Sequence, residues 1–265
     1  MLKIMAEPPE WKALLGFDFD GTLLVPGANP PLDPRFFESV RWVRENYGAA
    51  WGICTGRSLF QLVAGFTEGG FTHLPDFVVA REREIYFSGQ YGRWVNHDDW
   101  NKKSEKEHAK LFKKCRRHLK KVRNFVADNT GARWVSEEGD PAGIVAGDSL
   151  EMNEIVEFIA EMKLPPELTH ERNGIYLRFS HASYNKGTAL LEAGNRWGIG
   201  VDRTLAVGDN LNDISMLAPE VCEASGCPSN SVDEVKELIR ERGGVVAKRA
   251  GSQGVIEILG KYFDP

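Results

Sequence analysis

The chain has 265 residues, of which 42% are hydrophobic and 27% are charged, and its formal net charge is −5. This length allows one large globular domain or two modest ones, and the composition is that of an ordinary globular protein. The mildly acidic balance argues against general nucleic-acid binding, which usually needs a basic surplus.

The cysteines and the apolar segments indicate which cellular compartment to expect. The four cysteines, at positions 54, 115, 222 and 227, form no Cys-x-x-Cys pair and have no histidine at zinc-like spacing. We therefore expect reduced thiols in a reducing compartment. Residues 1–11 lack an apolar signal core, and no run approaches the ~18 apolar residues of a membrane span. A soluble cytoplasmic protein is the expectation.

The first predicted strand begins at Leu14 and ends in two acids. Side chains alternate faces along a strand, so Asp18 and Asp20 point to one side and Phe17 and Phe19 to the other. Gly21 follows and can supply a turn. Two acids are thus predicted at the carboxyl end of a buried strand, which is where open α/β sheets bind ligands.

Two neighbouring carboxylates such as Asp18 and Asp20 repel each other. They ionise together only beside a positive group, and a hard divalent cation with oxygen ligands is one candidate. A bare Asp-x-Asp is also compatible with an acidic turn at a strand end, so the motif alone leaves both interpretations open.

Strand and helix patterns then alternate up to residue 80. The sequence predicts a helix over about 34–47, a strand over 49–54, a helix from Ser58 and a strand over 77–80. This alternation is typical of a parallel sheet with helices on its faces.

The pattern changes over residues 81–181. Two short strand-like runs at 85–87 and 93–95 predict a hairpin, and Asn173-Gly174 predicts the turn of another between 168–172 and 175–179. Helices are expected over about 101–123 and 148–162. The first of them is strongly basic, which we interpret as the solvent face of an amphipathic helix, with a polyanion-binding face as the alternative. These residues predict an α+β insert.

The alternation resumes in the last segment. We expect helices over 185–197 and 212–217, strands over 204–207 and 245–247, and a helix over 255–262. A capping box at Ser231 and Glu234 predicts another helix that runs to about Arg242.

Four segments, in this order along the chain, together resemble the motifs of the haloacid dehalogenase-like phosphatase superfamily. They are Asp18-Phe19-Asp20-Gly21-Thr22-Leu23-Leu24, Cys54-Thr55-Gly56-Arg57, Asn185-Lys186-Gly187 and Gly208-Asp209-Asn210-Leu211-Asn212-Asp213. The insert between the second and third motifs resembles the C2-type cap of subfamily IIB, as in Cof-like and sucrose-phosphate phosphatases. Many Cof-like members have an Asn-Gly-Ala segment where this chain has Arg81-Glu82-Arg83-Glu84-Ile85-Tyr86.

The resemblance implies a fold and a domain division. The expected fold is α/β, with a Rossmann-like parallel sheet and helices on both faces, plus an inserted α+β cap. Residues 1–80 and 182–265 would form the core, and residues 81–181 the cap.

The resemblance also assigns roles to residues. Asp18 would be the nucleophile and Asp20 the general acid and base, while Thr55, Gly56 and Lys186 would bind phosphate. Mg²⁺ would be held by Asp18, Asp209 and the backbone carbonyl of Asp20. The remaining candidates fall into two groups: Asn212 and Asp213 would hold metal-bound water or orient Lys186, and the substrate candidates are Arg57, Arg83, Glu84 and Arg178.

The predicted function is a Mg²⁺-dependent phosphatase that acts on a small phosphorylated metabolite, with a sugar phosphate favoured, through an aspartyl-phosphate. Two alternatives stay open: a phosphomutase of the same superfamily, and a non-catalytic binding protein on an inherited fold. We expect a small-molecule substrate as the partner, without nucleic acid, membrane or an obligatory protein partner.

Overall fold

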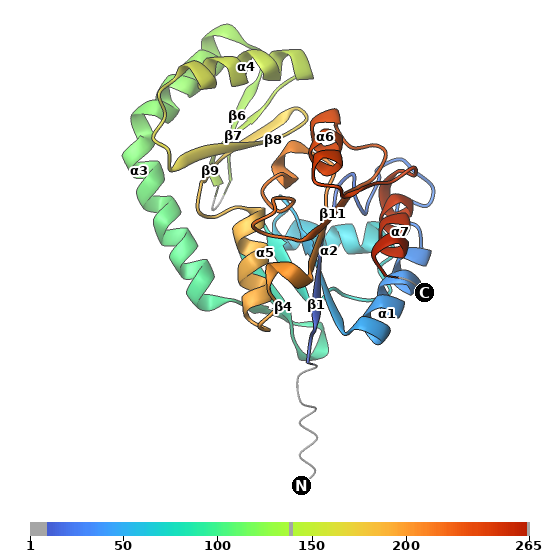
Figure 1. The fold of residues 1–265 in the computed structure, drawn as a ribbon. Coiled ribbons are helices and arrows are strands. Elements are labelled where there is room, and N and C mark those ends of the chain that lie inside the picture. The colour runs from blue at the N-terminus through green and yellow to red at the C-terminus, as the bar shows by residue number, and fades with distance from the viewer. Residues whose placement is uncertain (1–9, 138–139, 264–265) are drawn as a thin grey trace.

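Two β-sheets organise the chain in the computed structural model, which describes residues 10–137 and 140–263 (Figure 1). The larger has the spatial order β12-β11-β10-β1-β2-β3-β4-β5. Its strands are β1 (Ala13–Asp18), β2 (Ala49–Cys54), β3 (Phe77–Ala80), β4 (Glu84–Ser88), β5 (Trp94–Asn96), β10 (Thr204–Val207), β11 (Ala224–Cys227) and β12 (Val245–Val246). The six strands from β12 to β3 run parallel, and β4 and β5 are antiparallel additions at one edge.

Helices cover both faces of the larger sheet. One face packs against α1 (Arg35–Tyr47), α2 (Leu59–Glu68) and α7 (Gly251–Tyr262), and the other against α5 (Lys186–Asn195) and α6 (Asp233–Glu241). The central strands are apolar on both sides and almost fully buried, as parallel strands between two helix layers are. This confirms the predicted α/β fold with helices on both faces.

The second sheet is antiparallel and has the order β6-β7-β9-β8. It is built from β6 (Arg133–Glu137), β7 (Asp140–Val145), β8 (Leu168–Asn173) and β9 (Tyr176–His181), with α3 (Asp98–Asn129) and α4 (Ser149–Glu161) packed on one face. We call these two helices and four strands the four-stranded unit. Figure 1 shows it beside the larger sheet, with α3 running from beside β4 to the far end of the unit.

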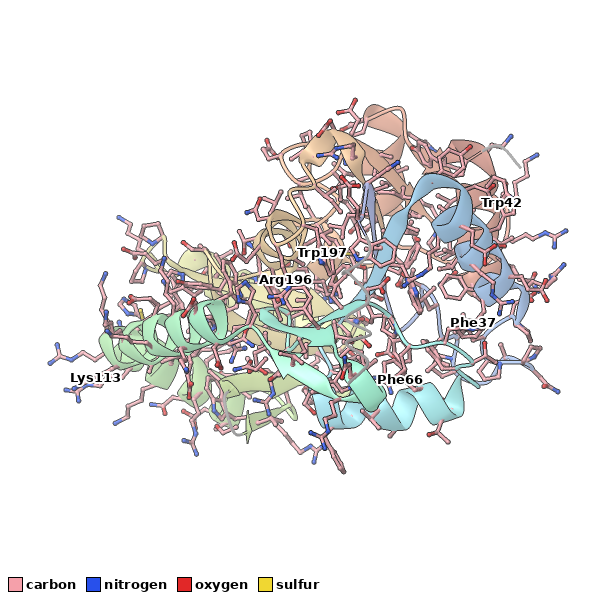
Figure 2. All side chains as sticks on the ribbon, turned by 90° about the horizontal axis from the view of Figure 1, so that it is seen from below. Phe37, Trp42, Phe66, Lys113, Arg196 and Trp197 are labelled. Atoms are coloured by element: carbon pink, nitrogen blue, oxygen red, sulfur yellow. The ribbon has the colours of Figure 1, made fainter. Side chains whose placement is uncertain are left out.

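Helix α3 matches the amphipathic pattern expected from the sequence. Its predicted apolar positions, from His108 to Val122, are buried, and its lysines and arginines are exposed. Lys113, for example, points away from the packed side of the helix (Figure 2). Within the described ranges, no helix combines the length and apolar character needed to cross a membrane.

Three strands in the structure had not been predicted. β7 and β11 are rich in small residues or turn formers, for example Ala224-Ser225-Gly226-Cys227 in β11, and β6 has only two apolar residues, Trp134 and Val135. They have no clear period-two pattern, and their strand conformation comes from pairing with neighbouring strands.

The hairpin β4–β5 was predicted from the sequence, but β4 pairs with β3, so the hairpin extends the larger sheet and does not join the second one. The division of the chain into core and cap stays a prediction.

One predicted helix and one predicted helix cap were wrong. In place of the helix expected over 212–217, the structure has a single 3₁₀ turn, Leu211–Asp213, followed by irregular turns. The Asp213 carboxylate accepts hydrogen bonds from the backbone N–H groups of Asp209 and Asn210 and closes this loop. Ser231 does not cap α6: its hydroxyl donates to the carbonyl of Pro228, and Val232 occupies the N-cap position.

Candidate active site

The predicted acids and hydroxyl meet at one edge of the larger sheet. β1 pairs in parallel with β2 on one side and with β10 on the other, so the carboxyl ends of the three strands coincide. Asp18, Thr55 and Asp209 stand at these ends, and all three are buried. Parallel pairing of three separate segments therefore brings three of the four motifs together.

Lys186 completes this cluster from the first turn of α5. Its side chain is fully buried, and its Nζ donates to Asp18 Oδ1 and to Asp213 Oδ1, each at 2.6 Å. Glu82 Oε2 lies 3.6 Å from the same nitrogen. Burial alone would lower the pKa of Lys186, but these carboxylates outweigh it and raise the pKa well above its ordinary value. The lysine stays charged among three acids.

Asp213 orients Lys186 and the loop that carries Asp209. Its Oδ1 accepts from Lys186, and its Oδ2 accepts from the backbone N–H groups of Asp209 and Asn210 at 2.8 and 2.9 Å. Of the two roles that the sequence left open for Asp213, these contacts correspond to the orientation of Lys186.

The acids beside Lys186 are suited to a divalent cation. Carboxylate oxygens of Asp18, Asp209 and Asp213 all lie within 4.8 Å of one another. Burial, followed by the charge of Asp213, raises the pKa of Asp18 well above its ordinary value and that of Asp209 to about 7. Crowded hard oxygen donors of this kind fit Mg²⁺. Both Asp213 oxygens already accept hydrogen bonds, so Asp18 and Asp209 are the residues that could hold it.

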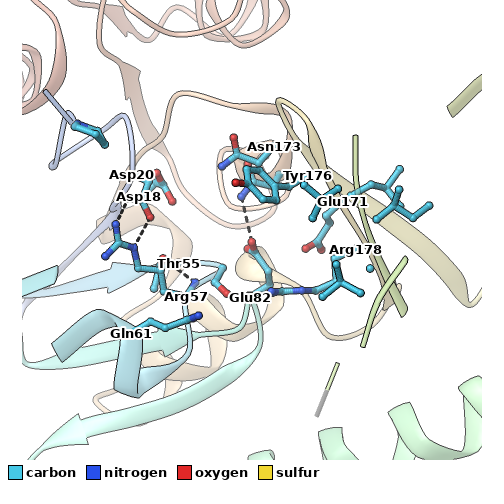
Figure 3. A pocket seen from close by; sticks show the side chains of 18 of the residues that line it. Asp18, Asp20, Thr55, Arg57, Gln61, Glu82, Glu171, Asn173, Tyr176 and Arg178 are labelled. Atoms are coloured by element: carbon cyan, nitrogen blue, oxygen red, sulfur yellow. Dashed lines mark hydrogen bonds and ion pairs between the residues drawn. The ribbon is translucent and has the colours of Figure 1, made fainter. Parts of the chain in front are cut away.

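Asp20 lies next to this cluster and is held by Arg57. The guanidinium forms two parallel hydrogen bonds to the Asp20 carboxylate, Nε to Oδ2 at 2.8 Å and Nη2 to Oδ1 at 2.5 Å (Figure 3). The Arg57 guanidinium also lies over the ring of Phe19, 4.9 Å from its centroid. Arg57, a predicted substrate residue, thus has Asp20 as its partner in the structure and fixes the direction of that acid.

A pocket of about 860 Å³ opens beside these residues, a volume within the range of small-molecule sites. The larger sheet contributes Asp18, Asp20, Thr55, Gly56, Arg57, Glu82 and Asn212, among others. The four-stranded unit contributes Val135, Gly143, Ile144, Val145, Glu171, Asn173, Tyr176, Leu177 and Arg178. The pocket therefore lies between the two sheets.

Two hydrogen bonds join the sheets across the pocket. Arg178 Nη1 donates to the carbonyl of Gly56 at 3.1 Å, and Asn210 Nδ2 donates to Asn173 Oδ1 at 3.0 Å. Arg178, a predicted substrate residue, therefore lines the pocket and also contacts the loop that follows β2.

The other two predicted substrate residues lie elsewhere. Arg83 and Glu84 are not among the residues that line the pocket, whereas their neighbour Glu82 is. Arg81 and Glu82 both adopt positive φ angles, +48° and +66°, and this turn directs Glu82 inward. Glu84 instead accepts a hydrogen bond from the hydroxyl of Tyr86 at 2.9 Å. In the sequence, residues 81–84 alternate between arginine and glutamate, and this pattern does not indicate whether Glu82 or Glu84 faces the pocket.

The chain is similar to known proteins in sequence and in fold. The family model of the haloacid dehalogenase-like hydrolases matches residues 71–259. A phosphoglycolate phosphatase from Methanothrix thermoacetophila is 29% identical over 102 residues, which are 38% of this chain and 42% of that protein. The chain thus matches less than half the length of this relative.

Solved structures resemble the whole chain. The sucrose-phosphatase of Synechocystis sp. PCC6803, solved with sucrose and phosphate, has a TM-score of 0.69 and 16% identity, and the match covers 95% of this chain and 98% of that one. The haloacid dehalogenase-like protein yhjK of Bacillus subtilis has a TM-score of 0.62 and 15% identity, with 96% and 92% covered. At these identities the likeness concerns the fold.

Proposed function

Because the chain belongs to the haloacid dehalogenase-like hydrolases, we propose that it is a Mg²⁺-dependent phosphatase of a small phosphorylated metabolite, with a sugar phosphate as the favoured substrate. The similarity to a phosphoglycolate phosphatase and to a sucrose-phosphatase supports phosphate-ester hydrolysis. The four buried free cysteines fit a reducing, cytoplasmic location.

The proposed reaction has two steps. The Asp18 carboxylate attacks phosphorus, the bond from phosphorus to the ester oxygen breaks, and Asp20 gives its proton to the departing alkoxide. Asp20 then takes a proton from water as that water attacks the aspartyl-phosphate, which releases inorganic phosphate and restores Asp18. The Arg57 pair holds Asp20 at the pocket wall next to Asp18, which is the position that this role requires.

The observation that supports the proposal most is the position of Lys186. A fully buried ammonium stands 2.6 Å from the Asp18 carboxylate, and charge stabilisation is the main need of phosphoryl transfer. Thr55 and Gly56 line the pocket together with Asp18 and would hold the phosphoryl oxygens.

Mg²⁺ would be held by Asp18 and Asp209, with the backbone carbonyl of Asp20 as a further ligand. When bound, it would supply positive charge to the phosphoryl group and to the crowded carboxylates. Asn212 lies in the pocket wall, where it could hold metal-bound water.

The test is phosphate release from a panel of phosphorylated metabolites, with Mg²⁺ and with a chelator added. We expect Asp18→Asn and chelation to abolish release, and Asp20→Asn to lower kcat by ~10²–10⁴-fold. The control Asp202→Asn alters a 77% exposed carboxylate and should leave the rate unchanged.

Two outcomes would contradict the proposal. Isomerised product without free phosphate would indicate a mutase. Phosphate release that survives Asp18→Asn would contradict the assignment of Asp18 as the nucleophile.

A further inference from the structure

Glu82 is a buried carboxylate that the proposed reaction does not use. It follows β3, and its side chain points into the pocket with 8% of its surface exposed (Figure 3). Its Oε2 lies 3.6 Å from Lys186 Nζ, and its Oε1 accepts a hydrogen bond from Asn212 Nδ2 at 3.1 Å. Glu82 therefore joins the lysine beside Asp18 to the loop that carries Asp209 and Asn212.

Backbone and side-chain contacts together hold Glu82 in place. Its φ of +66° is unusual for a residue with a Cβ, and such conformations persist only where the surroundings fix them. Its N–H donates to the carbonyl of Thr55 at 3.0 Å, and the N–H of Arg81 donates to that of Arg57 at 2.9 Å. The carboxylate lies against Gly56, where an added Cβ would be 2.7 Å from Oε1. The position of the carboxylate is thus defined at both ends of the residue.

The contact with Glu82 determines which way the Asn212 amide faces. An ionised carboxylate only accepts hydrogen bonds, so the side of the amide that meets Glu82 must be its NH₂ group. Asn212 Oδ1 is then directed away from Glu82, and it is buried and accepts no hydrogen bond within the described residues. Buried oxygens are normally satisfied, so this Oδ1 is available to a donor from a bound molecule.

A hydrogen-bond acceptor at Asn212 suits the neighbourhood of a cation. Asn212 lines the same pocket as Asp18, one of the two residues that could hold Mg²⁺. Mg²⁺ usually keeps several of its water molecules, and water held by a cation donates hydrogen bonds. The NH₂ group of a reversed amide could not accept them. Glu82 opposes that reversal, because Asn212 Oδ1 would then face the Glu82 carboxylate, oxygen against oxygen.

Lys186 depends on Glu82 less than Asn212 does. The lysine Nζ donates to Asp18 and Asp213 at 2.6 Å each, whereas the Glu82 oxygen lies 3.6 Å away, beyond hydrogen-bond distance. Within the described part of the chain, the hydrogen bond to Glu82 is the one that the Asn212 side chain makes. Loss of Glu82 should therefore affect the Asn212 amide first.

We propose that Glu82 is a positioning residue that holds the Asn212 amide with Oδ1 toward the Mg²⁺ site, where it accepts a hydrogen bond from metal-bound water. This role deepens the proposed phosphatase function and rests on the cation of that function. Residues that orient the surroundings of a metal in this way typically contribute about 10–100-fold to metal affinity or activity.

The test measures Mg²⁺ binding by the full chain without substrate, from the rise in melting temperature as Mg²⁺ is added. Glu82→Ala and Asn212→Ala should each raise the Kd for Mg²⁺ by about tenfold or more. The double variant should bind no more weakly than Asn212→Ala, because Glu82 acts through Asn212. The control Glu84→Ala removes a glutamate two residues further along, which contacts Tyr86 instead, and should keep the wild-type Kd. Asp209→Asn removes a proposed ligand and gives the background shift.

The outcomes separate this role from the phosphatase. An unchanged Kd in Glu82→Ala would overturn the role. So would a loss that Glu82→Ala repeats in full on the Asn212→Ala background, since Glu82 would then act through its charge alone. A wild-type Mg²⁺ shift no larger than that of Asp209→Asn would overturn both proposals. Mg²⁺ binding with the expected coupling, but without phosphate release from the metabolite panel, would support the role and overturn the phosphatase. Melting temperatures without Mg²⁺ confirm that each variant is folded.

Discussion

The Lys186 ammonium is fully buried, and three neighbouring carboxylates stabilise its positive charge. A buried ion is expensive to desolvate, and the attraction of its partners offsets that cost. The arrangement couples stability to chemistry, since the ammonium that would meet the phosphoryl group also keeps Asp18 and Asp213 from repelling each other.

Replacing Lys186 by methionine should therefore destabilise the protein strongly. Three buried acids, Asp18, Asp213 and Glu82, would lose their shared cation, and breaking a buried pair costs about 3–5 kcal/mol. Urea denaturation of Lys186→Met measures this loss in the free energy of unfolding. Lys163→Met, at an exposed position, should change it by less than about 0.5 kcal/mol. Equal stabilities of the two variants would refute the structural role.

Only site residues that belong to the recognisable motifs could be predicted from the sequence. Asp18, Thr55 and Asp209 stand at the carboxyl ends of neighbouring parallel strands, so their meeting follows from the pairing of the sheet. Glu82 and Glu171 could not be found in this way. Glu82 is directed inward by two positive φ angles, and Glu171 reaches the pocket only because the four-stranded unit docks there.

At the scale of elements, α5 begins in very close contact with the loop that follows Asp213. A Cβ on Gly187 would lie 2.1 Å from the carbonyl oxygen of Ser215 and 2.6 Å from its carbon. Backbone atoms cannot move aside as a flexible side chain can. The glycine after Lys186 thus lets the helix start approach the loop that carries Asp209 and Asp213.

Gly187→Ala should push α5 and this loop apart. We expect a loss of about 1–3 kcal/mol, as for other overpacked positions, together with reduced phosphate release because Lys186 moves with the helix. Gly260→Ala is a matched control in α7, where a Cβ meets nothing within 4 Å. It should raise stability by up to about 1 kcal/mol. Thermal melting of both variants measures the contrast, and the same shift in both would argue against the close packing.

Elements with a strong periodic pattern were predicted well, and those fixed by their neighbours were not. α3 and α1 have clear apolar stripes, and both exist as expected. β11 consists of small residues between β10 and β12, and it is a strand because those two strands flank it. The turn at 211–213 was predicted as a helix because hydrophobic spacing ignores the side-chain hydrogen bonds that Asp213 makes.

At the scale of the whole molecule, the pocket exists because two sheets face each other. Asn210 and Asn173 bond across it, as do Arg178 and Gly56. These two contacts therefore help to hold the two sheets in place around the pocket.

Asn173→Ala removes one contact between the sheets and should loosen the pocket without unfolding either sheet. One hydrogen bond of this kind contributes about 1 kcal/mol, so hydrogen exchange in residues 208–213 should quicken by roughly fivefold. The melting temperature should change little. Asn124→Ala, on the exposed face of α3, is the control and should leave exchange unaltered. Unaltered exchange in Asn173→Ala as well would mean that the contact does not hold the sheets together.

The position of β1 at the centre of the sheet has a consequence for biosynthesis. β2 follows β1 closely, but β10, its other neighbour, begins only at Thr204. At ribosomal speeds of about 5–20 residues per second, one edge of β1 waits roughly 10–40 s for its partner. The intervening four-stranded unit has local pairings and can form during that wait. The nascent chain therefore exposes an apolar strand edge for much of its synthesis, which is the interval in which a chaperone would matter most.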